Sequence, residues 1–341
     1  MVFRSFLFAG IGVAVAFIGS AAVAGGRQAG AEPPLDARVW LARVHDAASQ
    51  RNYHGTQVVT AGGTVSSSRV AHYCDGTHQY ERVDMLDGQM RRVFRHDDTV
   101  YTVWPQRRVA VVEQREPLPP FPGVLETGGE TLAEHYELMS QGPDRQAGYD
   151  ADVFLLKPKD RLRFAQRLWA ERETGLLLRS DVLGPRGEVL ESSAFSEVAI
   201  GVKPQPEVVL QPLKHLDGYR QVRPVVVPTQ LEKEGWSLKQ SVPGFKQVSC
   251  VKRPLDAVVP PVDGTASAEA LQTIFSDGLT HVSLFIEPFD GQRHRRPVAM
   301  AVGATHTFML RQDDWWITVV GDVPIPTLKQ FAASLERRKQ P

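Results

Sequence analysis

Short apolar runs separated by turn-forming residues are the main pattern between residues 149 and 198. The runs occupy residues 152–158, 164–171, 176–183 and 188–198. The segments between them contain glycine or proline, which favour turns, and they are too short for a crossover helix. This stretch is therefore predicted to form consecutive antiparallel strands in a meander.

The third of these runs also predicts how the meander is buried. Its residues alternate between two faces, with Leu176, Leu178 and Val182 on one and Leu177, Arg179 and Asp181 on the other. Because the second set includes charged side chains, we expect one face to cover a core and the other to meet water.

The same pattern continues upstream, after one predicted helix. The helix is expected over residues 36–48, with Asp36 as its N-cap, because four apolar residues share one helical stripe: Trp40, Leu41, Val44 and Ala48. Strands are then predicted at residues 53–60, 65–73, 79–84, 90–95, 100–104 and 107–112. Glycine, aspartate and proline turns separate them at a spacing of about ten residues, which is typical of an antiparallel layer.

A proline-rich segment at residues 116–123 interrupts the series, because prolines cannot donate to a sheet or continue a helix. We interpret it as a loop, and residues 117–122 as a candidate gate at the rim of the sheet. After it, Leu132, Tyr136 and Met139 share a helical face and predict a helix over residues 131–139.

The second half of the chain predicts a smaller α+β domain. Its expected strands lie within residues 242–250 and at residues 281–286, 298–302, 305–310 and 315–320, and a helix over 327–335 follows. Two closely spaced prolines make residues 201–221 resemble a linker. The predicted organisation is a signal peptide at 1–24, an antiparallel sheet domain at 35–200, a linker at 201–221 and the smaller domain at 222–338.

The first residues predict export from the cytoplasm. Arg4 supplies a positive charge, residues 5–18 are apolar, and Ala22-Val23-Ala24 fits an A-x-A cleavage site. An uncleaved membrane anchor is the alternative, but the apolar core is short and ends in small residues. Residues 1–24 are therefore assigned to a cleavable signal peptide.

Charge and cysteine content narrow the choice of partners. The chain has 39 basic and 39 acidic residues, which removes the usual electrostatic argument for nucleic acid, and none is predicted as a partner. The two cysteines, Cys74 and Cys250, can form one disulfide between the halves of an exported chain or stay as separate thiols.

The sequence contains none of the common catalytic or nucleotide-binding motifs. His72, Cys74 and His78 have metal-ligating side chains, but a structural zinc site needs four ligands and no second pair follows. We interpret them as strand residues around a tight turn. The acidic pairs at 97–98 and 313–314 are likewise interpreted as turn residues. No enzyme activity, metal or cofactor is predicted.

Aromatic side chains are concentrated in the predicted large sheet. They are Tyr80, Phe94, Tyr101, Trp104, Phe154, Phe164 and Trp169, with Phe121 in the proline-rich segment. Packing against the two predicted helices accounts for most of them. A sheet of about ten strands also curls, so part of its concave face could form an apolar cavity for an acyl chain. These eight residues are our candidates for lining it.

A series of short motifs resembles one family over nearly the whole chain after residue 24. In the first half they are Asn52-Tyr-His-Gly55, Ser67-Ser-Arg69 with His72, Met85-Leu-Asp-Gly88 with Arg91-Arg-Val93, and the hairpin from Leu168 to Leu183. In the second half they are Pro243-Gly-Phe245, Arg253-Pro254, Phe275-Ser-Asp-Gly-Leu279 and Val319 to Pro324. Their order and spacing resemble the RseB family of periplasmic regulators of the sigma-E envelope-stress response, called MucB in pseudomonads.

The resemblance implies an N-terminal half-barrel like that of the lipoprotein carriers LolA and LolB, wrapped around helices, and a smaller C-terminal domain. It implies a non-enzymatic negative regulator in the periplasm, which binds the periplasmic part of an anti-sigma factor of the RseA or MucA type. Binding would shield that factor from regulated proteolysis, and a lipid, lipoprotein or lipopolysaccharide signal would end the shielding. A homo-oligomer is compatible with the family, and a periplasmic carrier of lipoproteins or acyl chains is the alternative.

Overall fold

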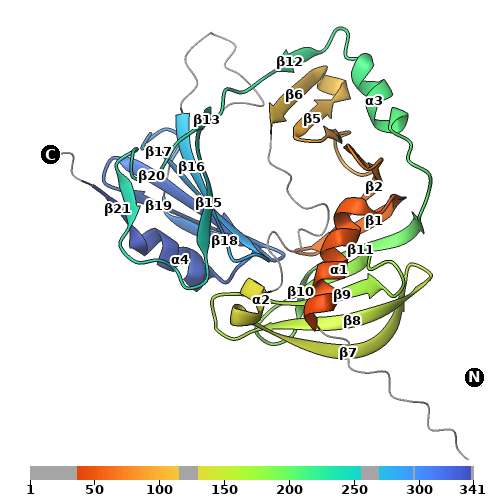
Figure 1. Cartoon of the computed structure of the whole chain (residues 1–341). Helices are drawn as coiled ribbons and strands as arrows, with labels where there is room; N and C mark the ends of the chain where they lie inside the picture. The colour runs from red at the N-terminus through yellow and green to blue at the C-terminus, as the bar shows by residue number, and fades with distance from the viewer. Residues whose placement is uncertain (1–36, 115–129, 255–268, 295, 339–341) are drawn as a thin grey trace, which may run out of the picture. The chain divides into compact units, whose positions relative to one another are not determined.

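The computed structural model describes residues 37–114, 130–254, 269–294 and 296–338. The predicted signal peptide, the proline-rich segment 116–123 and Phe121 lie outside these residues. The described chain is built on a large sheet of 12 strands and a second sheet of 7, with a two-stranded sheet beside the latter (Figure 1). None of the helices in these ranges is long and apolar enough to cross a membrane.

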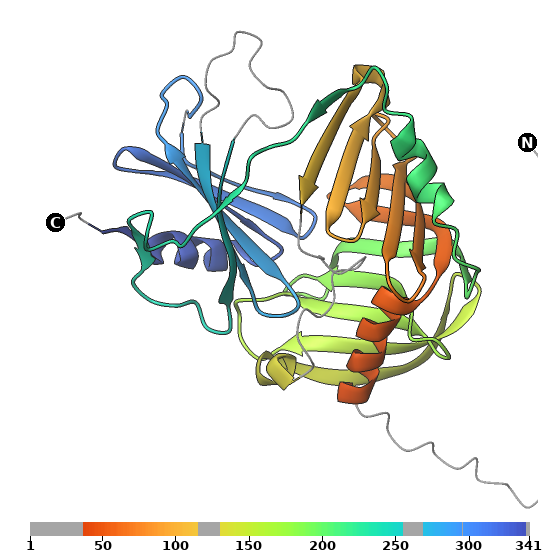
Figure 2. The same cartoon turned by 45° about the horizontal axis from the view of Figure 1, so that its top comes forward.

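The large sheet consists of two meanders that share one central pairing. The first meander is β1(Tyr53–Ala61), β2(Thr64–Cys74), β3(Gln79–Met85), β4(Arg92–His96), β5(Thr99–Trp104) and β6(Val109–Gln114), with the short 3-10 helix η1(Pro105–Arg107) before β6. The second is β7(Tyr136–Gln146), β8(Tyr149–Pro158), β9(Ala165–Glu171), β10(Leu177–Leu183) and β11(Val189–Ile200). Strand β1 pairs with β11, so the two meanders form one sheet, which curves without closing into a barrel (Figure 2). This confirms the predicted meander and the large antiparallel sheet.

Gly55 allows the central pairing to form. It lies opposite Val198 in the register of β1 with β11. A Cβ atom at this position would lie 2.3 Å from the carbonyl oxygen of Glu197, so any larger residue would push the two backbones apart. The glycine of the Asn52–Gly55 motif is therefore required by a close approach of backbone to backbone.

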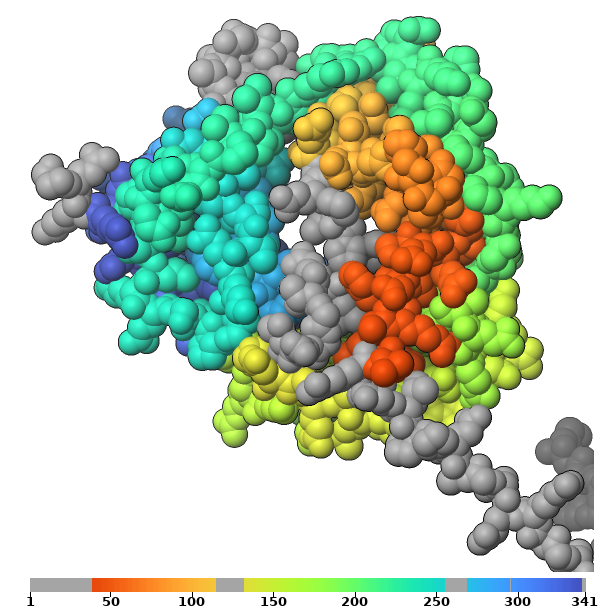
Figure 3. Space-filling model, viewed as in Figure 1, coloured from red at the N-terminus to blue at the C-terminus, as the bar shows by residue number. Residues whose placement is uncertain are grey.

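Helix α1(Ala37–Gln50) packs on the second meander through the face that the sequence predicts. Trp40, Leu41 and Val44 are buried there, and the Trp40 ring centroid lies 4.4 Å from that of Phe154 on β8. The side of the helix that carries Val39 remains exposed, and the space-filling view shows α1 at the surface (Figure 3). An amphipathic helix with one apolar stripe is held in this way by burial rather than by its own propensity.

The prediction for the segment that follows the proline-rich stretch was wrong. The helix expected over residues 131–139 ends early: α2(Glu130–His135) is short, and Tyr136 and Met139 belong to β7. Pro143 and the bulge between Ser140 and Gly142 are tolerated because β7 is the edge strand of the sheet.

The segment 201–221, which the sequence predicts to be a linker, includes regular structure. It contains α3(Glu207–Lys214), which begins after Pro206 and buries Val209 against β3 and β4, and the first two residues of β12(Arg220–Val222). Strand β12 pairs in parallel with β6 and extends the sheet. Proline is compatible with the first turn of a helix, so the proline content that suggested a linker marks the start of α3 instead.

The expectation that one face of residues 176–183 meets water was also wrong. Leu177 and Leu178 are both buried, and Asp181 is 1% exposed. Asp181 is covered because it accepts two hydrogen bonds from Arg179, at 2.8 and 2.7 Å, and one from Ser192 at 2.7 Å. On the face that was expected to meet water, Asp181 is therefore buried in an ion pair with Arg179.

The second sheet confirms the predicted smaller α+β layer. Its strands are β13(Val227–Pro228), β15(Lys246–Pro254), β16(Glu269–Ser276), β17(His281–Pro288), β18(Val298–Val302), β19(Thr305–Gln312) and β20(Trp315–Gly321), in the order β13-β15-β16-β17-β20-β19-β18. Helix α4(Ile325–Ser334) packs on β19 and β20, with Leu328 and Phe331 fully buried. Beyond it, β21(Leu335–Arg337) pairs with β14(Trp236–Leu238).

We expect Trp40→Ala to lower the free energy of unfolding by about 3–5 kcal/mol, because it removes a buried indole and leaves a cavity against Phe154. The neighbouring Val39→Ala is the matched control, since Val39 is 61% exposed, and its effect should stay within about 0.5 kcal/mol. Urea denaturation of both variants measures the difference. Equal effects of the two substitutions would contradict the packing of α1.

Candidate functional site

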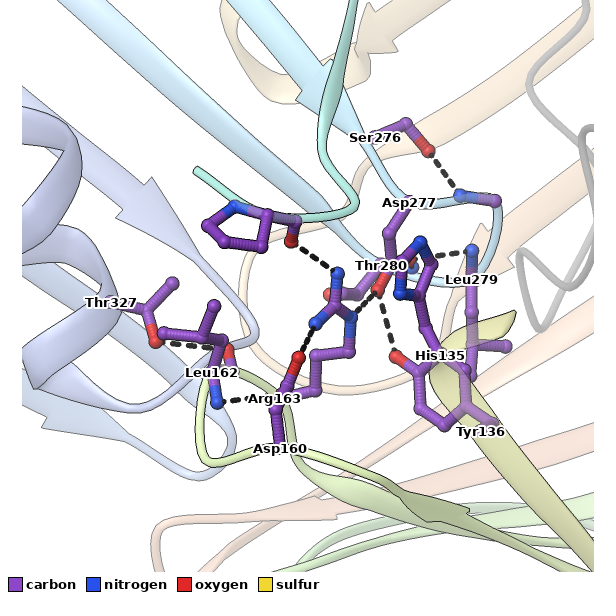
Figure 4. Close-up of polar contacts among 12 residues, drawn as sticks. His135, Tyr136, Asp160, Leu162, Arg163, Ser276, Asp277, Leu279, Thr280 and Thr327 are labelled. Atoms are coloured by element: carbon purple, nitrogen blue, oxygen red, sulfur yellow. Dashed lines mark hydrogen bonds and ion pairs between the residues drawn. The ribbon is translucent and has the colours of Figure 1, made fainter. Parts of the chain in front are cut away.

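A buried cluster of polar groups joins the large sheet to the second sheet. We call it the Arg163 junction and define it by Tyr136, Asp160, Arg163, Pro243 and Asp277 (Figure 4). Arg163 lies in the loop between β8 and β9, whereas Asp277 lies in the turn between β16 and β17. The side chains of both residues are 0% exposed.

Each of the three guanidinium nitrogens of Arg163 donates a hydrogen bond within this junction. Its Nε donates to Asp277 Oδ2 at 2.5 Å, and its Nη2 donates to the carbonyl oxygen of Pro243 at 2.7 Å. Its Nη1 donates to Asp160 in the same loop. The planar fork of an arginine suits three acceptors that lie in different directions, which a lysine could not satisfy in the same way.

The carboxylate of Asp277 accepts four hydrogen bonds, two on each oxygen. Oδ1 accepts the backbone N–H groups of Leu279 and Thr280, both at 2.9 Å, and this shapes the turn before β17. Oδ2 accepts the Tyr136 hydroxyl at 2.9 Å in addition to Arg163. Burial, followed by the nearby charge of Asp277, raises the pKa of Tyr136 well above its usual range, so the phenol keeps the proton that it donates.

The segment Pro243-Gly244-Phe245 covers one side of the junction. The Phe245 ring lies beneath the guanidinium of Arg163, 4.8 Å from its Cζ atom, in a cation–π contact. Gly244 has a φ of +81°, and a Cβ atom there would lie 2.0 Å from Arg163 Nη2. The glycine thus provides both the left-handed backbone and the space that the arginine needs.

Three further contacts connect the same two sheets. Arg253 on β15 donates to Glu113 on β6 at 3.1 Å, and the Thr327 hydroxyl on α4 donates to the carbonyl oxygen of Leu162 at 2.9 Å. The Phe164 ring packs edge-on against His306, with 5.3 Å between ring centroids. Two of these contacts are hydrogen bonds and the third is a ring contact with a fixed geometry, so they define one arrangement of the sheets rather than a sliding apolar surface.

The second sheet also has an exposed edge strand beside a hollow. All five residues of β18 are exposed, and Val298, Met300 and Val302 show 36%, 49% and 62% of their surface. The hollow of about 500 Å³ beside it is lined by Glu287, Arg293, His294, Arg296, Val298, Met309, Trp316 and Thr318. His294 stacks on Trp316 with 4.8 Å between centroids. We call these two features together the β18 edge.

The aromatic residues predicted to line a lipid cavity fall in several different places. Tyr80, Phe94 and Tyr101 pack with α3, and Phe154 packs with α1. Phe164 contacts His306 of the second sheet, and Trp104 is half-buried at the end of β5. Trp169 is held between Arg167 and Arg179, and its indole N–H donates to Asp144 at 2.8 Å. The structure does not gather them into one cluster, and their contact with lipid stays a prediction.

The two cysteines are separate thiols in this structure, so the disulfide considered from the sequence is not formed. Cys74 is half-buried at the end of β2, and Cys250 is buried on β15. Burial raises the pKa of the Cys250 thiol to about 11, which keeps it protonated and unreactive near neutral pH.

Sequence reasoning missed the junction and the β18 edge for different reasons. Arg163 and Asp277 are 114 residues apart, and nothing in the pattern around either residue indicates that they meet. The strand 298–302 was predicted, but its exposure depends on its place at the edge of the sheet. The short sequence motifs were the one signal available, because Pro243–Phe245 and Phe275–Leu279 both contribute residues to the junction.

These features define a class: a chain with one large open sheet and one smaller sheet, linked through a buried polar junction. The family model for the MucB/RseB N-terminal domain matches residues 36–213, and the model for the MucB/RseB C-terminal domain matches residues 230–336. The chain therefore belongs to the MucB/RseB family, as the sequence motifs indicated.

Individual relatives and solved structures agree with this membership. The Sigma factor AlgU regulatory protein MucB of Pseudomonas aeruginosa is 28% identical over 308 residues, which span 88% of this chain and 90% of that protein. The Sigma-E factor regulatory protein RseB of Haemophilus influenzae is 24% identical over 312 residues, or 89% and 92% of the two chains. A chain in the structure of the P. aeruginosa MucA/MucB complex is similar with a TM-score of 0.67 and 26% identity, over 89% of this chain and 100% of that one.

We expect Arg163→Ala to lower the free energy of unfolding by about 3–5 kcal/mol, because it leaves the Asp277 carboxylate buried without its cation. Arg172→Ala is the matched control: Arg172 pairs with Asp152 at 3.2 Å, but its side chain is 48% exposed, so about 1 kcal/mol or less should be lost. Urea denaturation followed by tryptophan fluorescence compares the two. A loss for Arg163→Ala no larger than the control would show that the junction does not hold the sheets.

Proposed function

We propose that this protein binds the periplasmic part of an anti-sigma factor of the RseA or MucA type and so regulates a sigma-E-type envelope-stress response. The observation that carries the proposal is the likeness, over 89% of this chain, to a chain in the MucA/MucB complex. Membership of the MucB/RseB family, through models that match both halves, supports it. The regulatory names of the curated relatives point in the same direction.

In the proposed mechanism the protein acts by occupancy rather than by catalysis. A bound segment of the anti-sigma factor is unavailable to a protease in proportion to the fraction that is bound. The predicted signal peptide would place this binding in the periplasm. A lipid, lipoprotein or lipopolysaccharide would release the partner only if it prefers a different arrangement of the two sheets. The Arg163 junction and the Arg253–Glu113 ion pair are the contacts that such a rearrangement would have to change.

We propose the β18 edge as the surface where the anti-sigma segment docks. Strand β18 ends the second sheet, so its outer row of backbone N–H and C=O groups has no neighbouring strand within the described residues. Such an edge accepts an additional extended segment through main-chain hydrogen bonds, with side-chain pockets providing selectivity.

The hollow beside β18 supplies chemistry for selectivity. Its apolar part is formed by Val298, Met309 and Trp316, and its polar part includes two arginines. Glu287 is nearly buried, and its Oε2 lies 3.3 Å from Arg293 and 3.4 Å from His294. The two arginines outnumber this one glutamate in the lining. The hollow therefore favours a docked segment that presents an acidic residue next to an apolar one.

We expect Met300→Lys to weaken binding of the anti-sigma segment by about tenfold or more, because a lysine on an edge strand opposes the addition of another strand. Met90→Lys is the matched control, since Met90 is similarly exposed, at 41% compared with 49%, but lies in the loop before β4. Calorimetric titration of each variant with the purified segment measures the effect. If both variants bind as the parent protein does, the segment docks elsewhere and this assignment fails.

The function itself is tested by co-purification of the protein with the periplasmic segment of its own anti-sigma factor, with and without lipopolysaccharide. A stable complex that dissociates when lipopolysaccharide is added is the expected result. Extraction and mass spectrometry of bound acyl chains from the same sample covers the carrier alternative. A protein that retains acyl chains but leaves the anti-sigma segment in the flow-through would overturn the regulator and favour the carrier.

A further inference from the structure

Three side chains with metal-binding atoms meet where two hairpins of the large sheet come together. His78 follows the turn between β2 and β3, whereas His96 and Asp97 lie at the turn between β4 and β5. One ligand atom from each lies within 4.8 Å of the other two. The Asp97 Oδ2 atom is the centre of this group, 2.7 Å from His78 Nδ1 and 3.6 Å from His96 Nε2.

We propose that His78, His96 and Asp97 bind a divalent transition-metal ion, of which zinc is the probe that we would use. Two imidazole nitrogens and one carboxylate oxygen are ligands that zinc and copper accept readily. Around a tetrahedral zinc at bond lengths of about 2.0–2.1 Å, ligand atoms lie about 3.3 Å apart. The two separations from Asp97 Oδ2, 2.7 and 3.6 Å, lie on either side of this value, and the nitrogens of the two imidazoles lie within 4.8 Å of each other. Side-chain rotations that bring the two imidazoles to the same distance would form the site.

Asp97 is already fixed in a suitable orientation by its backbone and by its second oxygen. Its φ of 50° places it in the left-handed region at the tip of a tight turn. Its Oδ1 accepts the N–H of Gln79 at 2.9 Å, and its own N–H donates to the Gln79 carbonyl at 3.0 Å. Oδ2 is therefore the oxygen left facing the two imidazoles, in the way that outer hydrogen bonds orient a metal ligand.

His96 carries a nitrogen that the rest of the structure does not use for a hydrogen bond. Its Nε2 is buried, and within the described residues it has no hydrogen-bond partner; its nearest carboxylate oxygen is that of Asp97 at 3.6 Å. The ring is held by stacking on Tyr80, with 4.9 Å between centroids and 8° between planes. A buried ring nitrogen without a hydrogen bond is costly, and a metal ion would give it a partner.

His78 completes the group from the other hairpin. Its backbone N–H donates to Asp75 Oδ1 at 2.8 Å, and Tyr80 donates its hydroxyl to Asp75 Oδ2 at 3.2 Å, so Asp75 orients both neighbours. A metal ion would replace the proton between His78 Nδ1 and Asp97 Oδ2.

Exposure of the three side chains leaves room for the remaining ligands. His78, His96 and Asp97 are 47%, 38% and 42% exposed. The side chains therefore reach solvent, although His96 Nε2 itself is covered, and water molecules or a group from a partner would complete the coordination, as in zinc sites that keep an open position. A metal bound here would join the β2–β3 turn to the β4–β5 turn.

The test is calorimetric titration of the untagged protein with zinc chloride in a buffer that does not bind zinc. We expect one zinc per chain, and an affinity about 100-fold lower or lost in His78→Gln and in His96→Gln. His54→Gln is the matched control, since His54 is an exposed histidine on β1, away from this group. Circular dichroism of each variant verifies that it is folded.

A second measurement identifies the ligands without relying on affinity. Cobalt(II) in place of zinc should give visible absorption bands that depend on both histidines and that change in Asp97→Asn. The proposal is overturned if zinc does not bind, or if it binds His78→Gln and His96→Gln as tightly as it binds His54→Gln. Either result would leave the His78–Asp97 contact as a hydrogen bond that only stabilises the turns.

Discussion

The pairing of β1 with β11 is the contact on which the large sheet depends. Each meander is built from strands that are neighbours in sequence. Strands β1 and β11 instead bring together residues that are far apart in the chain: Thr56 and Glu197, for example, are 141 positions apart. Gly55 makes the approach possible, because a side chain at this position would meet the Glu197 carbonyl. The single curved sheet and the position of α1, which contacts both β2 and β10, follow once this pairing is in place.

The junction between the sheets shows a different kind of constraint. A buried ion pair gains little stability compared with an apolar contact of the same shape, because both charges lose their hydration. What it provides is selectivity: Arg163 finds its acceptors in only one arrangement of the loop, the Pro243 segment and the Asp277 turn. We propose that this protein changes its affinity for its partner when the arrangement of its two sheets changes. Contacts that form in only one arrangement and add little net stability suit such a protein.

Much of the fold could be predicted from local patterns. Alternating apolar residues with Gly and Asp turns gave the strands, and the Trp40 stripe gave α1, because both depend on residues close in sequence. Helix α3 was missed because Pro204 and Pro206, just before it, suggested a linker. The helix over 131–139 was extended too far because Tyr136 and Met139 also fit an edge strand.

The candidate sites were much less accessible to sequence reasoning. The search for a metal site considered His72 and His78 together, whereas the structure stacks His72 on Tyr53 in the core and places His78 beside His96 of another hairpin. The partners of Arg163 lie in the second half of the chain. Both sites form through the pairing of strands and sheets, and that information is not present in the residues next to any one of their members.

The pairing of β14 with β21 has a consequence for the order in which the protein can fold. Residues 236–238 lie before every long strand of the second sheet, yet their partners are residues 335–337, and Arg337 covers the rings of Trp236 and Trp315. The predicted signal peptide implies that the chain crosses the membrane unfolded, with residues 236–238 ahead of residues 335–337. Trp236 then lacks its β21 partner until about a hundred further residues have arrived, and during that time the unfolded chain is open to chaperones and proteases.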